Sequence, residues 1–157
     1  MVRTMQFAWA EIRHGWVTFV VSGESGRLRA SVGDGIDAPR LLLNAMSALL
    51  NGAAAVTFSF DGEPTEIRWN MQMIRGELKV SISLHPQWGE EENVKTPWVE
   101  EGLPLLALAE VIHRETEFLI NSLGEEGYRE AWALHGTPTD ALKELKSSIE
   151  RVRANSG

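Results

Sequence analysis

The chain has 157 residues, a formal net charge of −7 at pH 7 and no cysteine. This length fits one domain covering residues 1–157, and the missing cysteines exclude disulfides and thiolate-bound metals. The acidic balance argues against nucleic acid and anionic membranes as partners, and no apolar run approaches the roughly 20 residues that span a bilayer. We therefore expect a cytoplasmic protein without a cofactor, whose charge would suit a basic protein partner.

The first third of the chain predicts three antiparallel strands. Apolar and polar side chains alternate over residues 5–12, 16–22 and 28–32, which is the period of a half-buried strand. We expect a three-residue turn that pairs Ile12 with Trp16. A two-residue turn would place the apolar side chains of one strand opposite the polar side chains of the other.

A helix and a second three-stranded meander should follow. After Asp37, a suitable N-cap, apolar residues repeat at helical spacing: Leu42, Ala45, Met46 and Leu49. Alternation returns over residues 54–60, 67–73 and 78–84. The last two of these strands should pair in a register that gives one apolar and one polar face, with the pairs Met73–Leu78, Met71–Val80, Trp69–Ile82, Gln72–Lys79, Arg68–Ser83 and Glu66–His85.

The remaining residues predict an irregular segment and three helices. Residues 85–102 show no period, and a loop of this length is functional, disordered or a sign of a missed element. A long helix should run from Pro104 to a break at Gly124, followed by a short helix and a last helix. Val111 and Phe118 form a second apolar stripe on the long helix, so we expect it to lie between the sheet and a later helix.

The predicted order is therefore βββα-βββααα. This is an α+β fold in which two three-stranded meanders form one continuous antiparallel sheet or two packed sheets, with helices packed on one face.

No catalytic, metal or nucleotide motif stands out. Glu110, His113 and Glu117 share one side of the long helix, but a dinuclear site would need this E-x-x-H spacing on two helices. We interpret them as a solvated helix edge and expect no catalytic, cofactor-binding or metal-binding residues.

Two surfaces are candidates for function. The irregular segment combines tryptophans, which are frequent interface anchors, with acidic residues that suit a basic surface. The candidate partner-binding residues are Trp88, Glu90, Glu91, Glu92, Trp98, Glu100 and Glu101. Alternatively, both tryptophans fold back onto the core and the glutamates are merely solvated. The other candidate is the polar face of the second sheet, with Glu66, Arg68, Asn70, Ser83 and His85.

The chain resembles a family of short bacterial proteins. The features that carry the resemblance are Trp16 after Gly15, the leucine-rich helix at 41–50, Glu63-Pro64 followed by Arg68-Trp69, and Gly124 with Gly127-Tyr128 and Trp132. These positions imply a fold and no reaction. Some small acidic bacterial proteins of this kind are immunity proteins that neutralise toxins. The resemblance implies this role by analogy only, and it assigns no functional residue in this chain.

Three hypotheses follow from the sequence. The first is a non-enzymatic protein-binding domain, in its narrower form a toxin-neutralising, immunity-type protein. The second is a small-molecule binder or enzyme that uses the polar sheet face. The third is a structural homodimer.

Overall fold

A computed structural model describes residues 4–156 and shows an α+β fold with two antiparallel sheets. The N-terminal sheet has the order β1-β2-β3 and the C-terminal sheet the order β4-β5-β6-β7. The elements are β1 (Gln6–Arg13), β2 (Trp16–Gly23), β3 (Gly26–Gly33), α1 (Ala38–Leu50), β4 (Ala55–Gly62), β5 (Thr65–Ile74), β6 (Glu77–His85), β7 (Lys95–Leu103), α2 (Leu105–Ala131) and α3 (Thr139–Ser156).

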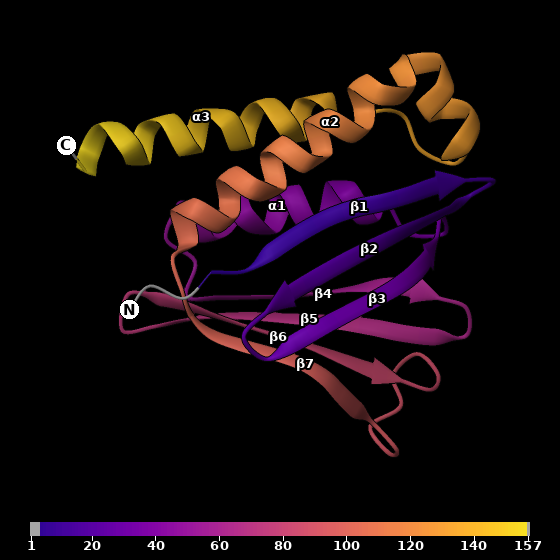
Figure 1. Ribbon diagram of the computed structural model, residues 1–157, viewed down its shortest axis with the longest axis horizontal. Coiled ribbons are helices and arrows are strands. Elements are labelled where there is room, and N and C mark those ends of the chain that lie inside the picture. The colour runs from indigo at the N-terminus through magenta and orange to yellow at the C-terminus, as the bar shows by residue number, and fades with distance from the viewer. Residues whose placement is uncertain (1–3, 157) are drawn as a thin grey trace.

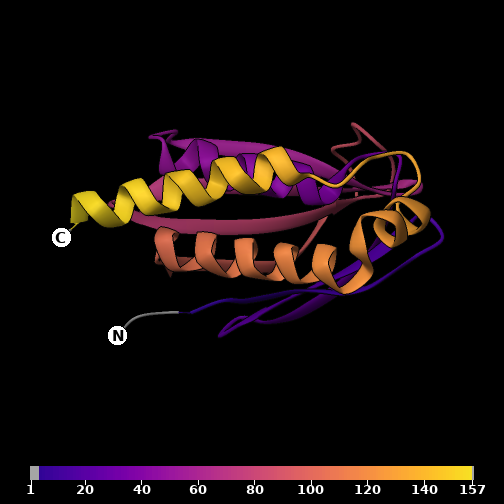
Figure 2. The ribbon, with the colours of Figure 1, turned by 90° about the horizontal axis from the view of Figure 1, so that it is seen from above.

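The apolar faces of the two sheets meet, and the helices close one side of the space between them (Figure 1). Aromatic rings make the contact between the sheets: Phe19 lies 5.4 Å from Trp69 and 5.7 Å from Phe60 between ring centroids. Seen from above, α2 and α3 lie side by side along the molecule (Figure 2). No helix in residues 4–156 is long and apolar enough to cross a membrane.

The predicted second meander gains a fourth strand. Residues 85–102, for which no regular structure was predicted, contain most of β7, which pairs with β6 through irregular registers. Pro97, Glu100-Glu101 and Gly102 interrupt the alternation that would have revealed this strand. The irregular part is therefore reduced to the short loop 86–94.

The first hairpin corrects the predicted turn. Arg13 pairs with Trp16, so the turn has two residues, and both adopt positive φ, 51° at His14 and 82° at Gly15. The apolar faces still match because a β-bulge places Ala10 and Glu11 opposite one residue of β2. The bulge moves the inward-facing positions from odd to even numbers, a change that the alternation in the sequence does not predict.

The predicted register between β5 and β6 is confirmed in all six pairs, from Glu66–His85 to Met73–Leu78. This register places Glu66, Arg68, Ser83 and His85 on the polar face of the C-terminal sheet, next to the loop that follows β6.

The predicted helix break is present inside α2. Gly124 adopts φ 72° and ψ 167°, a conformation that is essentially restricted to glycine. The break redirects the chain so that Trp132, fully buried, donates a hydrogen bond from Nε1 to Asp37 Oδ1 at 3.2 Å. Asp37 precedes α1 but makes no side-chain cap to that helix, because its carboxylate accepts from Trp132 and from Arg40 instead.

We expect Gly124→Ala to lower the free energy of unfolding by about 1–3 kcal/mol. A methyl group at this position would meet no atom within 4 Å, so the cost would come from the backbone conformation alone. Gly127→Ala is the matched control, since Gly127 lies in the helical part of α2 and alanine should be neutral or stabilising there. Urea unfolding of both variants provides the measurement; equal effects would contradict the assignment of the break to Gly124.

Helix α2 packs against both β1 and α3, as the position between a sheet and a later helix predicts, but α3 does not cover the second apolar stripe. Helix α3 packs on another flank, where Arg153 forms an ion pair with Glu110. Val111 is therefore only partly buried and Phe118 is 68 % exposed.

Candidate functional site

The polar face of the C-terminal sheet holds a buried carboxylate. Glu66 on β5 is 5 % exposed and accepts hydrogen bonds from Arg68 Nε at 3.0 Å, Arg68 Nη2 at 3.2 Å and Ser59 Oγ at 2.5 Å. Glu66 and Arg68 lie two residues apart on one strand, and Ser59 on β4 pairs directly with Arg68. The strand period thus places all three side chains on the same face.

The loop 86–94 folds back onto this carboxylate. The backbone N–H of Gly89 donates to Glu66 Oε1 at 3.0 Å, and Arg68 Nη1 lies 3.1 Å from Glu91 Oε1. Loop and sheet are therefore joined through both members of the Glu66–Arg68 pair. We call residues 86–94, held in this way, the anchored loop.

His85, at the end of β6, supplies a second anchor. Its Nδ1 lies 2.6 Å from the carbonyl oxygen of Glu90, which can only accept, so Nδ1 carries a proton. On the other side of the ring, Nε2 lies 3.0 Å from Ser83 Oγ. Since His85 is 2 % exposed and Ser83 8 %, the imidazole is a structural group under the loop.

Burial by itself would raise the pKa of Glu66. The hydrogen bonds from Arg68, Gly89 and Ser59 and the charge of Arg68 outweigh it and lower this pKa from an ordinary 4.5 to about 2. The carboxylate is therefore ionised at neutral pH, and as an acceptor of four hydrogen bonds it is suited to hold the loop. A general acid would instead need a raised pKa.

The anchors leave a tryptophan and carboxylates facing solvent. Trp88 is 47 % exposed, although its neighbours Gly89 and Glu90 are both bonded to the sheet through their backbones. Glu91 and Glu92 are also exposed, and Glu90 is half-buried. The loop thus presents one large aromatic side chain and an acidic run from a backbone fixed at two adjacent residues.

The structure brings only part of the predicted partner-binding set together. Trp98 is 1 % exposed and donates from Nε1 to the Gly26 carbonyl at 3.1 Å. Glu100 is 2 % exposed and accepts from the N–H and the hydroxyl of Ser25 at 3.0 and 3.1 Å. Both attach β7 to the turn between β2 and β3, so neither lies on the surface of the anchored loop.

The last two predicted residues lie away from the loop. Glu101 is exposed near the opposite end of β7, where it lines a hollow with Arg75 and Lys79. Asn70, on the polar sheet face, is half-buried and accepts a hydrogen bond from Thr57 at 3.0 Å. The polar sheet face was predicted to be exposed, but Glu66, Ser83 and His85 are buried.

The metal-like spacing on α2 assembles no site. Glu110 is paired with Arg153, and burial together with Lys146 lowers the pKa of His113 despite the nearby Glu117. Within residues 4–156, no group of three or more His, Asp or Glu side chains is arranged to hold a metal ion.

Two groups that join the two candidate surfaces were not predicted from the sequence. Ser59 and the backbone N–H of Gly89 complete the shell of Glu66, and neither carries a motif. The predicted cross-strand register did place Glu66 beside His85 at the start of the loop, and this pairing was the sequence feature that indicated contact between the sheet face and the loop. The two predicted surfaces are in fact one structure, with the polar sheet face supporting the acidic loop.

Comparison of this chain with known protein families, with curated proteins and with solved structures gives no match. A function has to be inferred from the residues themselves.

Proposed function

We propose that this protein is a non-enzymatic protein-binding domain that recognises a basic surface through the anchored loop. The observation that carries the proposal is the exposure of Trp88 beside two backbone groups bonded to the sheet. Association costs less when the contact residues are already ordered, because less conformational freedom is lost.

The chemistry of the loop defines the partner. Tryptophan is among the most frequent residues that dominate binding energy. The exposed carboxylate of Glu92 complements lysine or arginine, whereas Glu91 is already paired with Arg68. The net charge of −7 would accelerate encounter with a positively charged protein. In its narrower form, the proposal is that the partner is a basic toxin that this domain neutralises, by analogy with immunity proteins.

The buried groups of the polar face favour binding over catalysis. The side chains that a reaction would use, Glu66 and His85, have their polar atoms bonded to protein groups. Their role in holding the loop accounts for their burial without invoking a substrate.

We expect Trp88→Ala to weaken binding to the partner at least about tenfold, since a central tryptophan commonly contributes more than 1 kcal/mol. The partner would be captured from native cell extract with p-benzoylphenylalanine at position 87, where Gln87 is exposed beside Trp88, then identified by mass spectrometry, purified and titrated by calorimetry. Leu134→Ala is the control, because Leu134 is 68 % exposed but follows α2.

Three results would contradict the proposal. They are equal affinity of the Trp88→Ala and Leu134→Ala variants, a captured protein without a basic surface, and affinity that does not fall with rising salt. For the narrower form, a captured partner should inhibit growth when produced alone and lose this effect when the domain is co-expressed.

A further inference from the structure

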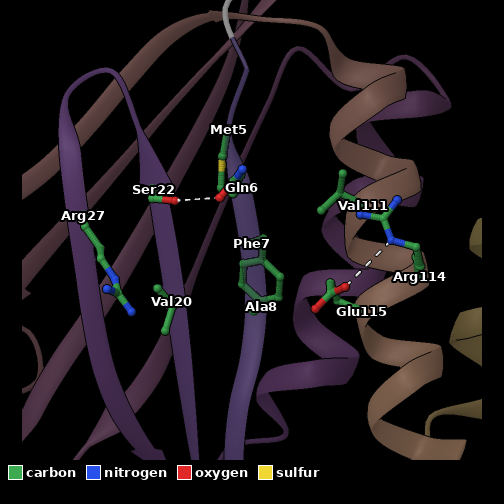
Figure 3. A pocket seen from close by; sticks show the side chains of 10 residues that line it. All are labelled: Met5, Gln6, Phe7, Ala8, Val20, Ser22, Arg27, Val111, Arg114 and Glu115. Carbon is green, nitrogen blue, oxygen red and sulfur yellow. Dashed lines mark hydrogen bonds and ion pairs between the residues drawn. The ribbon is translucent and has the colours of Figure 1, made fainter.

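A cavity of about 410 Å³ lies beside the N-terminal sheet, lined by residues around β1, β2, β3 and α2 that are all outside the anchored loop (Figure 3). Its volume is within the range of pockets that hold small molecules. The buried Trp9 Nε1 donates a hydrogen bond to Thr116 Oγ1 at 3.0 Å, and the neighbours of this pair in the chain, Ala8 and Glu115, line the cavity. Strand β1 and helix α2 are therefore joined at its border, and the space is a short hollow.

Two arginines from different elements line this cavity. Arg27 is exposed on β3, and within residues 4–156 it forms no ion pair or side-chain hydrogen bond. Arg114 of α2 lies 3.8 Å from the carboxylate of Glu115, a long contact at the surface that contributes little. Figure 3 shows the two arginines on either side of Gln6 and Ser22. The cavity thus offers two guanidinium groups, which favour carboxylates as partners.

A smaller, apolar hollow of about 130 Å³ adjoins the cavity. Apart from Thr4, the residues that line it are all apolar: Met5, Leu103, Pro104, Ala107, Leu108 and Val111. Two of them, Met5 and Val111, also line the larger cavity, so the two spaces meet at these side chains. An apolar group in this hollow would be removed from water.

The geometry of α2 sets the distance between the charged and the apolar space. Arg114 lines the first and Ala107 the second, and the seven residues between them correspond to about 10 Å of helix. A ligand that reaches both needs an anionic head group and an apolar chain of about this length. A compact anion would leave the hollow empty, and a hydrocarbon would leave the arginines without a counter-charge.

We propose that the two spaces together bind a medium-chain carboxylate. Its head group lies at Arg27 and Arg114, and its chain passes Met5 and Val111 into the apolar hollow. The site shares no residue with the anchored loop, so binding of the carboxylate and binding of a basic protein can be tested separately.

The probe for this proposal is decanoate, titrated into the full chain by calorimetry. Saturable binding is expected, and octanoate should bind about tenfold more weakly, because each buried methylene contributes about fourfold to affinity. Acetate, which has the charge without the chain, should not bind. No saturation by decanoate up to about 1 mM, or equal affinity for octanoate, would overturn the proposal.

The matched cation, decyltrimethylammonium, separates this site from general adsorption of a surfactant. A protein with a net charge of −7 would prefer the cation if only its overall charge and apolar surface mattered. At the proposed site the cation should instead bind at least about tenfold more weakly than decanoate, because it meets the two arginines. Equal or tighter binding of the cation would overturn the proposal.

Variants locate the two ends of the ligand. Arg27→Glu and Arg114→Glu should each weaken binding of decanoate about tenfold, whereas Arg129→Glu, an exposed position of α2 beyond Gly124, is the control. Ala107→Phe should fill the apolar hollow and remove the preference for decanoate over octanoate. Ala154→Phe is its control, since Ala154 is exposed on α3. Equal effects of a variant and its control would place the ligand elsewhere.

Nuclear magnetic resonance tests the placement without a substitution. Nuclear Overhauser contacts are expected between the chain of decanoate and the methyl groups of Met5 and Val111, which line both spaces. Contacts confined to other side chains would overturn the proposed site even if decanoate binds.

Discussion

Replacing Glu66 with glutamine is expected to lower the free energy of unfolding at pH 7 by about 3 kcal/mol. The carboxylate accepts four hydrogen bonds from three residues, whereas an amide has one oxygen and would turn its NH₂ towards a donor. Arg68 is 23 % exposed, so water screens part of its interaction and the figure is an upper value.

The effect of Glu66→Gln should depend on pH in a defined direction. The pKa of Glu66 is lowered from 4.5 to about 2 in the folded chain. The contribution of the Glu66 carboxylate to the free energy of unfolding is therefore complete at pH values above its pKa in the unfolded chain. It is lost as the pH falls through about 2, the pKa in the folded chain. The stability difference between wild type and variant should be constant from pH 7 to about 5 and shrink below that. Urea unfolding at several pH values gives this difference directly; a difference that grows towards low pH would contradict the lowered pKa.

The same variant should release the anchored loop. Hydrogen exchange at the Gly89 amide, which donates to Glu66, should become faster than expected from the global loss of stability. Thr57→Ala is a suitable control, because it removes a hydrogen bond on the same face without touching the loop.

Replacing Trp69 with alanine is expected to cost about 3–5 kcal/mol, the range of large core truncations. Trp69 is fully buried and its ring contacts Phe7, Phe19, Phe58 and Phe60. It joins the two sheets, so the cavity would open at the centre of the core. A cost below about 1 kcal/mol in urea unfolding would contradict this packing.

Tryptophan-to-phenylalanine substitutions test how much a hydrogen bond from a buried indole N–H contributes to stability. The Nε1 of Trp69 has no hydrogen-bond partner within residues 4–156, whereas that of Trp98 donates to Gly26. Each Trp→Phe change removes the same atoms, but only Trp98→Phe breaks a hydrogen bond. We therefore expect Trp98→Phe to be the more destabilising by about 1 kcal/mol.

Strand periodicity predicted the fold class and one full register. The regular alternation of β5 and β6 left a single apolar face, so one pairing satisfied every residue. The same reasoning gave the wrong turn after β1 because it assumed an unbroken period. Ala10 is compatible with a bulge or a regular strand, and no local signal distinguishes the two.

The site was less predictable than the fold. The sequence could not predict that Trp88 is exposed and Trp98 is buried, because both are tryptophans in a segment without a regular alternation of apolar and polar residues. The difference comes from tertiary contacts, since Trp98 is buried against the turn that contains Gly26. Likewise, a row of polar residues predicted a solvated face, but the loop between β6 and β7 folds back over it through contacts with the distant residues Glu66 and Arg68.

The bulge at Ala10 restricts how the first hairpin can change in length. Deleting Ala10 while keeping the two-residue turn would remove the bulge and leave Trp9 opposite Phe19 and Phe7 opposite Val21, so the inward-facing side chains of β1 would keep their phase. Deleting Ala8 would instead place Phe7 opposite Val20, so that Phe7 would point outwards and Gln6 inwards. A single deletion in β1 should therefore be tolerated at the bulge and rejected between Phe7 and Trp9.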